Sequence, residues 1–205
     1  MKRFLAIVFL AVILLAAWYL FFKTDKKTKN SKSEDSVQMQ VTKHSAEFNK
    51  SVDDMVNAYL NMKNAFVNWD TTSVKRDVAL FVASADSLKL DELQKSDSLI
   101  FLAVQQNIND IKANAQPISQ ENDITEMRHD FSMISENLYP LLKSVGYEGA
   151  KLYWQNCPMA FGDDKPANWL SNTRDIQNPY LGNKHPEYKS AMVSCGENMD
   201  SIYTK

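Results

Sequence analysis

The sequence predicts an all-α protein: an up-and-down four-helix bundle, an irregular C-terminal segment packed on it, and an N-terminal transmembrane helix. Three observations lead to this fold class. Four successive segments repeat apolar residues at steps of three and four, as the buried faces of helices do. The 205 residues include only five Gly and six Pro, too few for a loop-rich β-sandwich. An unbroken apolar run also stands close to the start of the chain.

Composition and charge indicate a globular domain that does not bind nucleic acid. Hydrophobic residues make up 44% of the chain and charged residues 23%, which is typical of a globular domain. Residues 1–32 hold seven Lys and Arg and one Asp, whereas residues 33–205 hold sixteen Lys and Arg against twenty-four Asp and Glu. The part expected to fold is therefore acidic. Nucleic acid is excluded as a partner, because it would require a basic surface.

The apolar run from Phe4 to Phe22 predicts a membrane anchor over residues 1–22. It spans about 28 Å as a helix, enough to cross the hydrocarbon core of a bilayer. A cleaved signal peptide is the alternative, but the run ends in bulky residues instead of the small ones that cleavage requires. The lysines that follow the run favour a cytoplasmic C-terminus. A short N-terminal tail is compatible with export as well.

A linker and a helical bundle are expected next. Residues 23–43 are rich in Lys, Ser, Asp and Gln, which predicts a flexible stem. The bundle is expected over residues 44–146. His44, at the boundary, is assigned to the stem. Periodic apolar residues begin at Phe48. No sequence repeat follows.

The four helices are delimited by capping residues and helix breakers. The first should end near Asp70, and Thr72 or Ser73 can cap the second. Ser96 can cap the third, which should end near Pro117. Pro140 predicts a kink in the fourth, and Gly146 suits the position just after its end. The apolar residues expected to face the core are Phe48, Val52, Met55, Val56, Tyr59 and Phe66; Val74, Val78, Phe81, Ala85 and Leu88; Leu99, Leu102, Ala103, Ile108 and Ile111; and Ile124, Met127, Phe131, Ile134, Leu138, Leu141 and Val145.

The C-terminal segment, residues 147–205, differs in composition from the helices but is expected to belong to the same domain. It contains Trp154, Trp169, both cysteines, and turn signals at Asn178-Pro179 and Gly182-Asn183. Such a segment is irregular yet too aromatic to be a free tail. Loops held by a rigid scaffold are where binding residues concentrate.

Two short sulfur-containing clusters in this segment can carry chemistry. Cys157 is followed by Pro158 and Met159, and Met192 precedes Cys195 by three residues. Cysteine and methionine are soft ligands that select Cu(I) or a similar ion. In an extended chain Cys157 and Met159 would face the same way, and in a helical turn Met192 and Cys195 would share a face.

Two other interpretations of the cysteines remain open. A Cys157–Cys195 disulfide would close a loop of about 39 residues, worth roughly 4 kcal/mol, and inert buried thiols are the third possibility. His129 is expected on the outer face of the fourth helix; it becomes a further ligand if the C-terminal segment folds back over it. His185 lies in a turn and is expected to be solvated. Motifs for catalysis and haem attachment are absent, so no enzyme activity and no catalytic residue are predicted.

The chain resembles a bacterial family, the domain of unknown function 3347, over roughly residues 50–200. The resemblance is carried by Arg128, Phe131 and Ser135; Tyr153, Cys157, Pro158, Met159 and Ala160; Trp169, Leu170 and Ser171; Ile176, Asn178, Pro179, Tyr180 and Gly182; and Met192, Cys195 and Gly196. It implies an exported helical domain with a role in heavy-metal binding or trafficking, since similar modules are attached to periplasmic adaptor subunits of copper and silver efflux pumps. This chain departs from the family's spacing by extra residues at 184–191.

The resemblance and the sulfur ligands together predict a single-pass inner-membrane protein with its domain in the periplasm. That domain would bind Cu(I) or Ag(I) through Cys157, Met159, Met192, Cys195 and His129, for metal handling or efflux. Its partners would be the membrane and a metal-efflux adaptor or other periplasmic protein. The alternative is a non-metal structural or protein-interaction module stapled by a Cys157–Cys195 disulfide. The two methionines favour the metal-binding function, because Cu(I) benefits from nearby thioethers whereas a disulfide needs none.

Overall fold

The computed structural model describes residues 44–203. The predicted transmembrane helix and the linker over residues 23–43 lie outside the described residues, so both stay predictions. Of the helices in the described part, none has the length and apolar character needed to span a bilayer.

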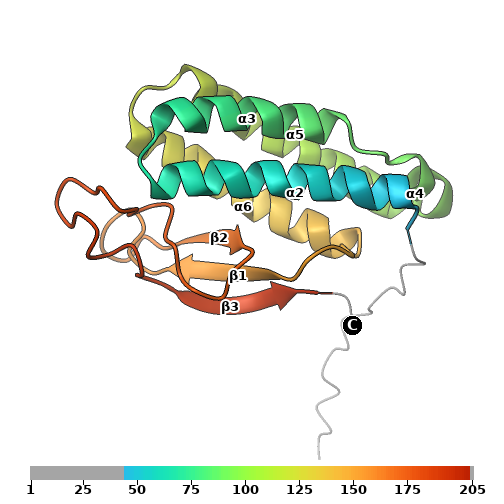
Figure 1. Ribbon diagram of the computed structural model, residues 1–205. Coiled ribbons are helices and arrows are strands. Elements are labelled where there is room, and N and C mark those ends of the chain that lie inside the picture. The colour runs from blue at the N-terminus through green and yellow to red at the C-terminus, as the bar shows by residue number, and fades with distance from the viewer. Residues whose placement is uncertain (1–43, 204–205) are drawn as a thin grey trace, which may run out of the picture. The chain divides into compact units, whose positions relative to one another are not determined.

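Four long helices and one short helix make up the first part of the described chain (Figure 1). They are α2 (Ala46–Val67), α3 (Thr71–Asp86), the short α4 (Asp91–Ser96), α5 (Ser98–Gln120) and α6 (Ile124–Ser144). Helix α2 packs against α3, α3 against α5, and α5 against α6. This neighbour order is the one that an up-and-down bundle has. The four long helices that the periodicity predicts are therefore present, and α4 is an addition to them.

The apolar faces of α2, α3 and α6 are largely those that the sequence predicts, although Leu88 lies beyond the end of α3. In α5, Ile108 and Ile111 are buried as predicted, but the predicted residues of the first turns, Ala103 included, are exposed. Leu99 and Leu102 are 77% and 59% exposed. The buried residues of α5 are Val104, Ile108, Ile111, Ala115 and Ile118. The prediction was wrong for the first turns because it counted leucines that lie on the solvent side of this stripe. Pro117 does not end α5 either: the helix continues to Gln120, and Ile118 in its last turn is buried.

The helix ends show which capping predictions were right. Gly146 follows α6 with φ +63°, as expected for a residue just past a helix end. The caps of α3 and α5 are aspartates, not the predicted Thr72 or Ser73 and Ser96. Asp70 accepts a hydrogen bond from the Ser73 backbone, and Asp97 accepts two, from Leu99 and Ile100. A carboxylate at this position also interacts favourably with the positive end of the helix dipole.

Because Asp97 rather than Ser96 caps α5, the two residues should respond differently to alanine. We expect Asp97→Ala to lower the free energy of unfolding by about 1 kcal/mol through loss of the two capping hydrogen bonds. Ser96 only donates its hydroxyl to the Glu92 carbonyl within α4, 2.8 Å away, so Ser96→Ala should change stability by less than about 0.5 kcal/mol. Urea unfolding of both variants measures the difference; equal losses would contradict the assignment.

The C-terminal segment is only partly irregular, because it also contains a small antiparallel sheet that the sequence analysis did not predict. Its strands are β1 (Leu152–Cys157), β2 (Ala167–Ser171) and β3 (Glu197–Ile202), in the order β2-β1-β3. These strands are only five or six residues long. Strands β1 and β3 also carry Asn, Gln, Asp or Glu, residues that strands usually avoid. Local sequence therefore gave a weak strand signal, and the fold is mostly helical instead of all-α.

Helix α6 holds the sheet against the bundle. Strand β2 packs on α6, the Trp154 ring stacks on Tyr139 with centroids 4.4 Å apart, and Asn168 donates a hydrogen bond to Glu136 over 2.7 Å. These contacts fix the sheet of the C-terminal segment, and the loops that connect its strands, to the rigid helix α6.

Candidate functional site

The two cysteines meet where one strand ends and another is about to begin. Cys157 is the last residue of β1, and Cys195 stands two residues before β3. Strands β1 and β3 pair antiparallel, with Asn156 opposite Glu197, so the sheet register itself brings these chain segments together. The two Sγ atoms lie 3.3 Å apart and both thiols are free.

Cys195 is held by backbone geometry on either side of it. Gly196 has φ +143°, and a Cβ built on it would lie 2.6 Å from the Asn156 carbonyl oxygen. Only glycine therefore lets the chain approach β1 this closely. The buried side chain of Asn178 donates a hydrogen bond to the Cys195 carbonyl (2.8 Å), and its backbone N–H donates to the Val193 carbonyl (2.8 Å). The turn that carries Cys195 is thus clamped from the Asn178-Pro179 turn.

The environment of the thiol pair favours the protonated state of Cys195. Cys157 is fully buried and Cys195 is half-buried. Partial burial and the neighbouring Cys157 thiol raise the pKa of Cys195 to about 11. At neutral pH Cys195 is therefore a thiol, and any ion that binds it as a thiolate must displace its proton.

Met159 and Met192 both pack against the hydrophobic core of the domain, but their local geometries relative to the cysteines differ. Both side chains are partly buried against the hydrophobic core that includes Cys157. Met192 and Cys195 share one turn, in which the Cys195 N–H donates to the Met192 carbonyl (3.0 Å), as the three-residue spacing predicts. Strand β1 ends at Cys157, however, and Met159 lies in the turn that follows. The extended conformation assumed for the Cys157–Met159 pair is thus not present.

His129 is exposed on α6 and contacts the C-terminal segment through an aromatic ring. The imidazole stacks on Phe161 with centroids 3.8 Å apart, and Phe161 in turn packs edge-on against Tyr180. The segment does fold back over His129. Within residues 44–203, no three His, Cys, Asp or Glu side chains gather as a metal site would require. The pair that the structure brings together is Cys157 and Cys195, and His129 as a ligand stays a prediction.

Two buried polar atoms on the neighbouring strands β1 and β2 were not identified from the sequence. Gln155 and Trp169 are paired across β1 and β2. The Oε1 atom of Gln155 and the Nε1 atom of Trp169 are buried without a hydrogen-bond partner in the part of the chain that the structure describes. The Trp169 ring also reaches Gly196, where an added Cβ would lie 3.0 Å from it. Only the strand register, which the sequence does not reveal, places this tryptophan next to Cys195.

His185 is less solvated than the sequence suggests. Its ring stacks on Tyr188 with centroids 4.7 Å apart and meets Trp69 edge-on at 5.7 Å. Trp69 covers the buried guanidinium of Arg128, whose carbon lies 4.0 Å from the ring centroid. Partial burial and the positive charge of Arg128 lower the pKa of His185. These aromatic contacts fix the loop around residues 181–188 against the end of α2.

Comparison with known families gives one match. The model of the family described as "Protein of unknown function (DUF3347)" matches residues 55–149, which confirms the resemblance noted from the sequence. The match is shorter than the expected residues 50–200: it contains Arg128, Phe131 and Ser135 but ends before β1 and both cysteines. No curated protein and no solved structure matches the chain significantly.

Proposed function

We propose that this protein, whose residues 55–149 match the DUF3347 family model, binds a soft monovalent metal ion, Cu(I) or Ag(I), through Cys157 and Cys195. The observation that carries the proposal is the 3.3 Å contact between two free thiols at adjacent strand ends. Two sulfur donors held this close need little rearrangement to bind one ion together. Thiolates are also the ligands that such ions prefer.

The surroundings of the pair support binding of a metal as cargo. Half-buried Cys195 gives an ion a route from solvent, whereas buried Cys157 provides a dry donor. Met192 shares a turn with Cys195 and Met159 lies two residues after Cys157, and the thioethers that they carry favour Cu(I) over harder ions. The raised pKa of Cys195 means that binding displaces a proton.

We further propose that the protein acts at a membrane, without enzyme activity. The apolar run Phe4–Phe22 would anchor it in the inner membrane, with the metal-binding domain in the periplasm. There it would pass metal to an efflux adaptor or another periplasmic protein. The support for this location is the length of the apolar run and the resemblance to modules attached to such adaptors.

The test of the metal proposal is a Cu(I) titration of the full chain in detergent, in competition with a chromophoric Cu(I) chelator. The reduced chain should take up one equivalent of Cu(I). The same chain oxidised beforehand should take up none, because a disulfide leaves no thiolate to coordinate. Failure of the reduced chain to compete with the chelator would refute the proposal.

A structural module with a Cys157–Cys195 disulfide is the second candidate, and the same short Sγ–Sγ distance favours it. An exported domain usually oxidises such a pair. The two candidates differ in what reduction does. For the structural module, reduction should lower the free energy of unfolding by roughly 4 kcal/mol, the chain entropy of a loop of this size, and should create no Cu(I) site.

A further inference from the structure

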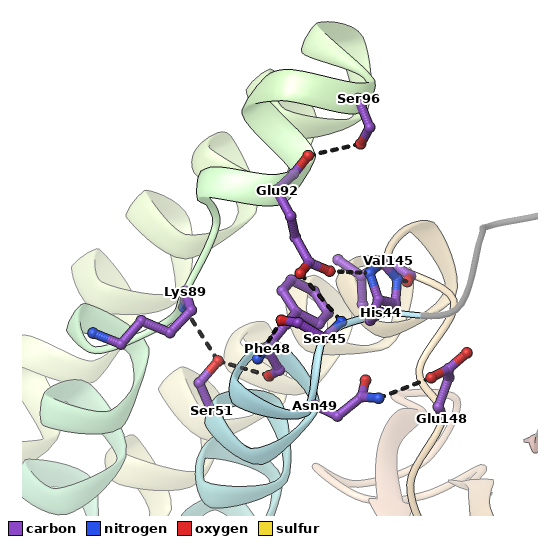
Figure 2. Close-up of polar contacts among 10 residues, drawn as sticks. All are labelled: His44, Ser45, Phe48, Asn49, Ser51, Lys89, Glu92, Ser96, Val145 and Glu148. Atoms are coloured by element: carbon purple, nitrogen blue, oxygen red, sulfur yellow. Dashed lines mark hydrogen bonds and ion pairs between the residues drawn. The ribbon is translucent and has the colours of Figure 1, made fainter.

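His44 stands at the start of the described chain, immediately before α2, but it is not part of a solvated stem as the sequence suggested. Its side chain is only 4% exposed. The ring stacks on Phe48 with centroids 4.2 Å apart, and each ring nitrogen has a partner from a different element. Nδ1 lies 2.5 Å from a carboxylate oxygen of Glu92 in α4, and Nε2 lies 2.5 Å from the Val145 carbonyl at the end of α6 (Figure 2).

The chemistry of these two partners determines which form of the ring fits. A backbone carbonyl can only accept, so Nε2 must carry a hydrogen. Glu92 is an acceptor as long as it is ionised. Partial burial alone would raise the pKa of Glu92, but hydrogen bonds from Ser45 and His44 hold it below its ordinary value. Nδ1 must then carry a hydrogen too, and only the imidazolium cation has hydrogens on both nitrogens.

The charges around the ring agree with a cation at this position. The second oxygen of Glu92 accepts the Ser45 N–H over 3.2 Å. The Val145 carbonyl belongs to the last turn of α6, the negative end of that helix dipole. Glu148, on the loop after α6, is held by Asn49 over 2.8 Å. The ammonium of Lys89 points away from the cluster, and only its backbone N–H reaches Ser51 (Figure 2).

We propose that His44 is a proton-dependent latch: its protonated ring fixes the chain that leads into α2 to both α4 and the end of α6. Loss of one ring proton removes a hydrogen-bond donor and leaves a lone pair facing either Glu92 or Val145. The contact then opens and frees His44, Ser45 and the first turn of α2. The latch also has a lower limit, because protonation of Glu92 removes the anion that the imidazolium faces. This device is independent of any metal at the cysteines.

The first test measures the ring itself. Nitrogen-15 spectra of the full chain, labelled at histidine, should show both nitrogens of His44 protonated at pH 6. His185, whose ring stacks on Tyr188 and lies outside the latch, serves as the internal comparison for the two nitrogen signals. A neutral His44 ring at pH 6 in the folded protein would overturn the proposal.

The second test follows the amides that the latch protects, Ser45, Phe48 and Asn49, by hydrogen–deuterium exchange from pH 6 to pH 9. After correction for the intrinsic rate, exchange in the wild type should accelerate by at least about tenfold on deprotonation, the equivalent of one hydrogen bond to a charged group. His44→Gln and Glu92→Gln should exchange fast at every pH. Glu126→Gln, a control on an exposed carboxylate in the first turn of α6, at the end of that helix opposite Val145, should behave like the wild type.

Equal pH dependence in the wild type and in His44→Gln would show that another group controls these amides, and the latch would be rejected. Should His44→Gln fail to fold, the nitrogen-15 spectra of the wild type decide the question alone.

Discussion

Replacing Cys195 with serine is expected to weaken Cu(I) binding by the reduced chain more than about 100-fold, beyond the usual cost of losing an outer-shell partner of a metal site. Serine keeps the size and the turn but has no soft donor. Cys195 is the better site for this change, because it is half-buried and its replacement leaves no cavity, unlike that of fully buried Cys157. Ser194→Ala, at an exposed neighbouring position, is the matched control and should bind as the wild type does.

The methionine variants and the pH dependence extend this prediction. Met159→Leu and Met192→Leu should each weaken binding less than Cys195→Ser, because a neutral thioether contributes less than a thiolate. The pKa of Cys195 is about 11, so its thiol is protonated near neutral pH. Each ion that binds Cys195 as a thiolate therefore releases the thiol proton. Apparent affinity should therefore rise with pH, by about tenfold per unit for each proton released. Affinity that is independent of both pH and Cys195 would exclude the thiol site.

The sequence was sufficient to predict the long helices because their stabilisation comes from periodic apolar faces. Phe131 illustrates this: it recurs at the right step on α6, and its ring lies against Tyr59 and Phe66 of α2. Leu99 shows where apolar periodicity fails as a predictor of burial, since an apolar residue at helical spacing can equally lie on the solvent side. Which face of α5 is buried depends on neighbouring helices, and that information is not local.

The donors of the candidate site stay a prediction, and the contact between the two cysteines was not predictable from sequence. The pairing of Cys157 with Cys195 could be proposed from residue type alone. Their contact depends on the β1–β3 register and on the approach of Gly196 to β1, and both are long-range features. His44 was assigned to the stem because its own neighbours in sequence are polar. Its partners Glu92 and Val145 lie 48 and 101 residues away, beyond any local pattern.

The residues of the family match that were noted on α6 have a structural explanation. Arg128 donates hydrogen bonds to the Pro179 carbonyl from Nε (2.8 Å) and to the Phe66 carbonyl from Nη2 (3.1 Å). Ser135 bonds the Tyr59 hydroxyl over 2.7 Å, and that hydroxyl accepts the Leu170 N–H over 3.1 Å. Both α6 residues therefore connect α2 with the C-terminal segment. The carbonyl that Arg128 binds, that of Pro179, directly follows Asn178, whose side chain binds the Cys195 carbonyl.

Replacing buried Arg128 should consequently destabilise the protein, and lysine should be a worse substitute than methionine. Methionine fills the space but leaves the Pro179 carbonyl without its Arg128 donor, whereas the Phe66 carbonyl keeps the hydrogen bond from the Trp69 N–H (3.1 Å). We expect a loss of about 2 kcal/mol after the relief of burying a cation. Burial lowers the pKa of Arg128 to about 9, so at neutral pH the wild-type residue is charged and already carries that desolvation cost. Lysine would keep the desolvation cost, yet its single ammonium lacks the planar guanidinium that reaches both carbonyls. We therefore expect a loss of about 3 kcal/mol for Arg128→Lys.

Urea unfolding at pH 7 should rank the stability of Arg128→Lys below that of Arg128→Met, and both below that of the exposed control Arg174→Met. If lysine proved as stable as arginine, the charge alone and not the two directed hydrogen bonds would hold the C-terminal segment to the bundle.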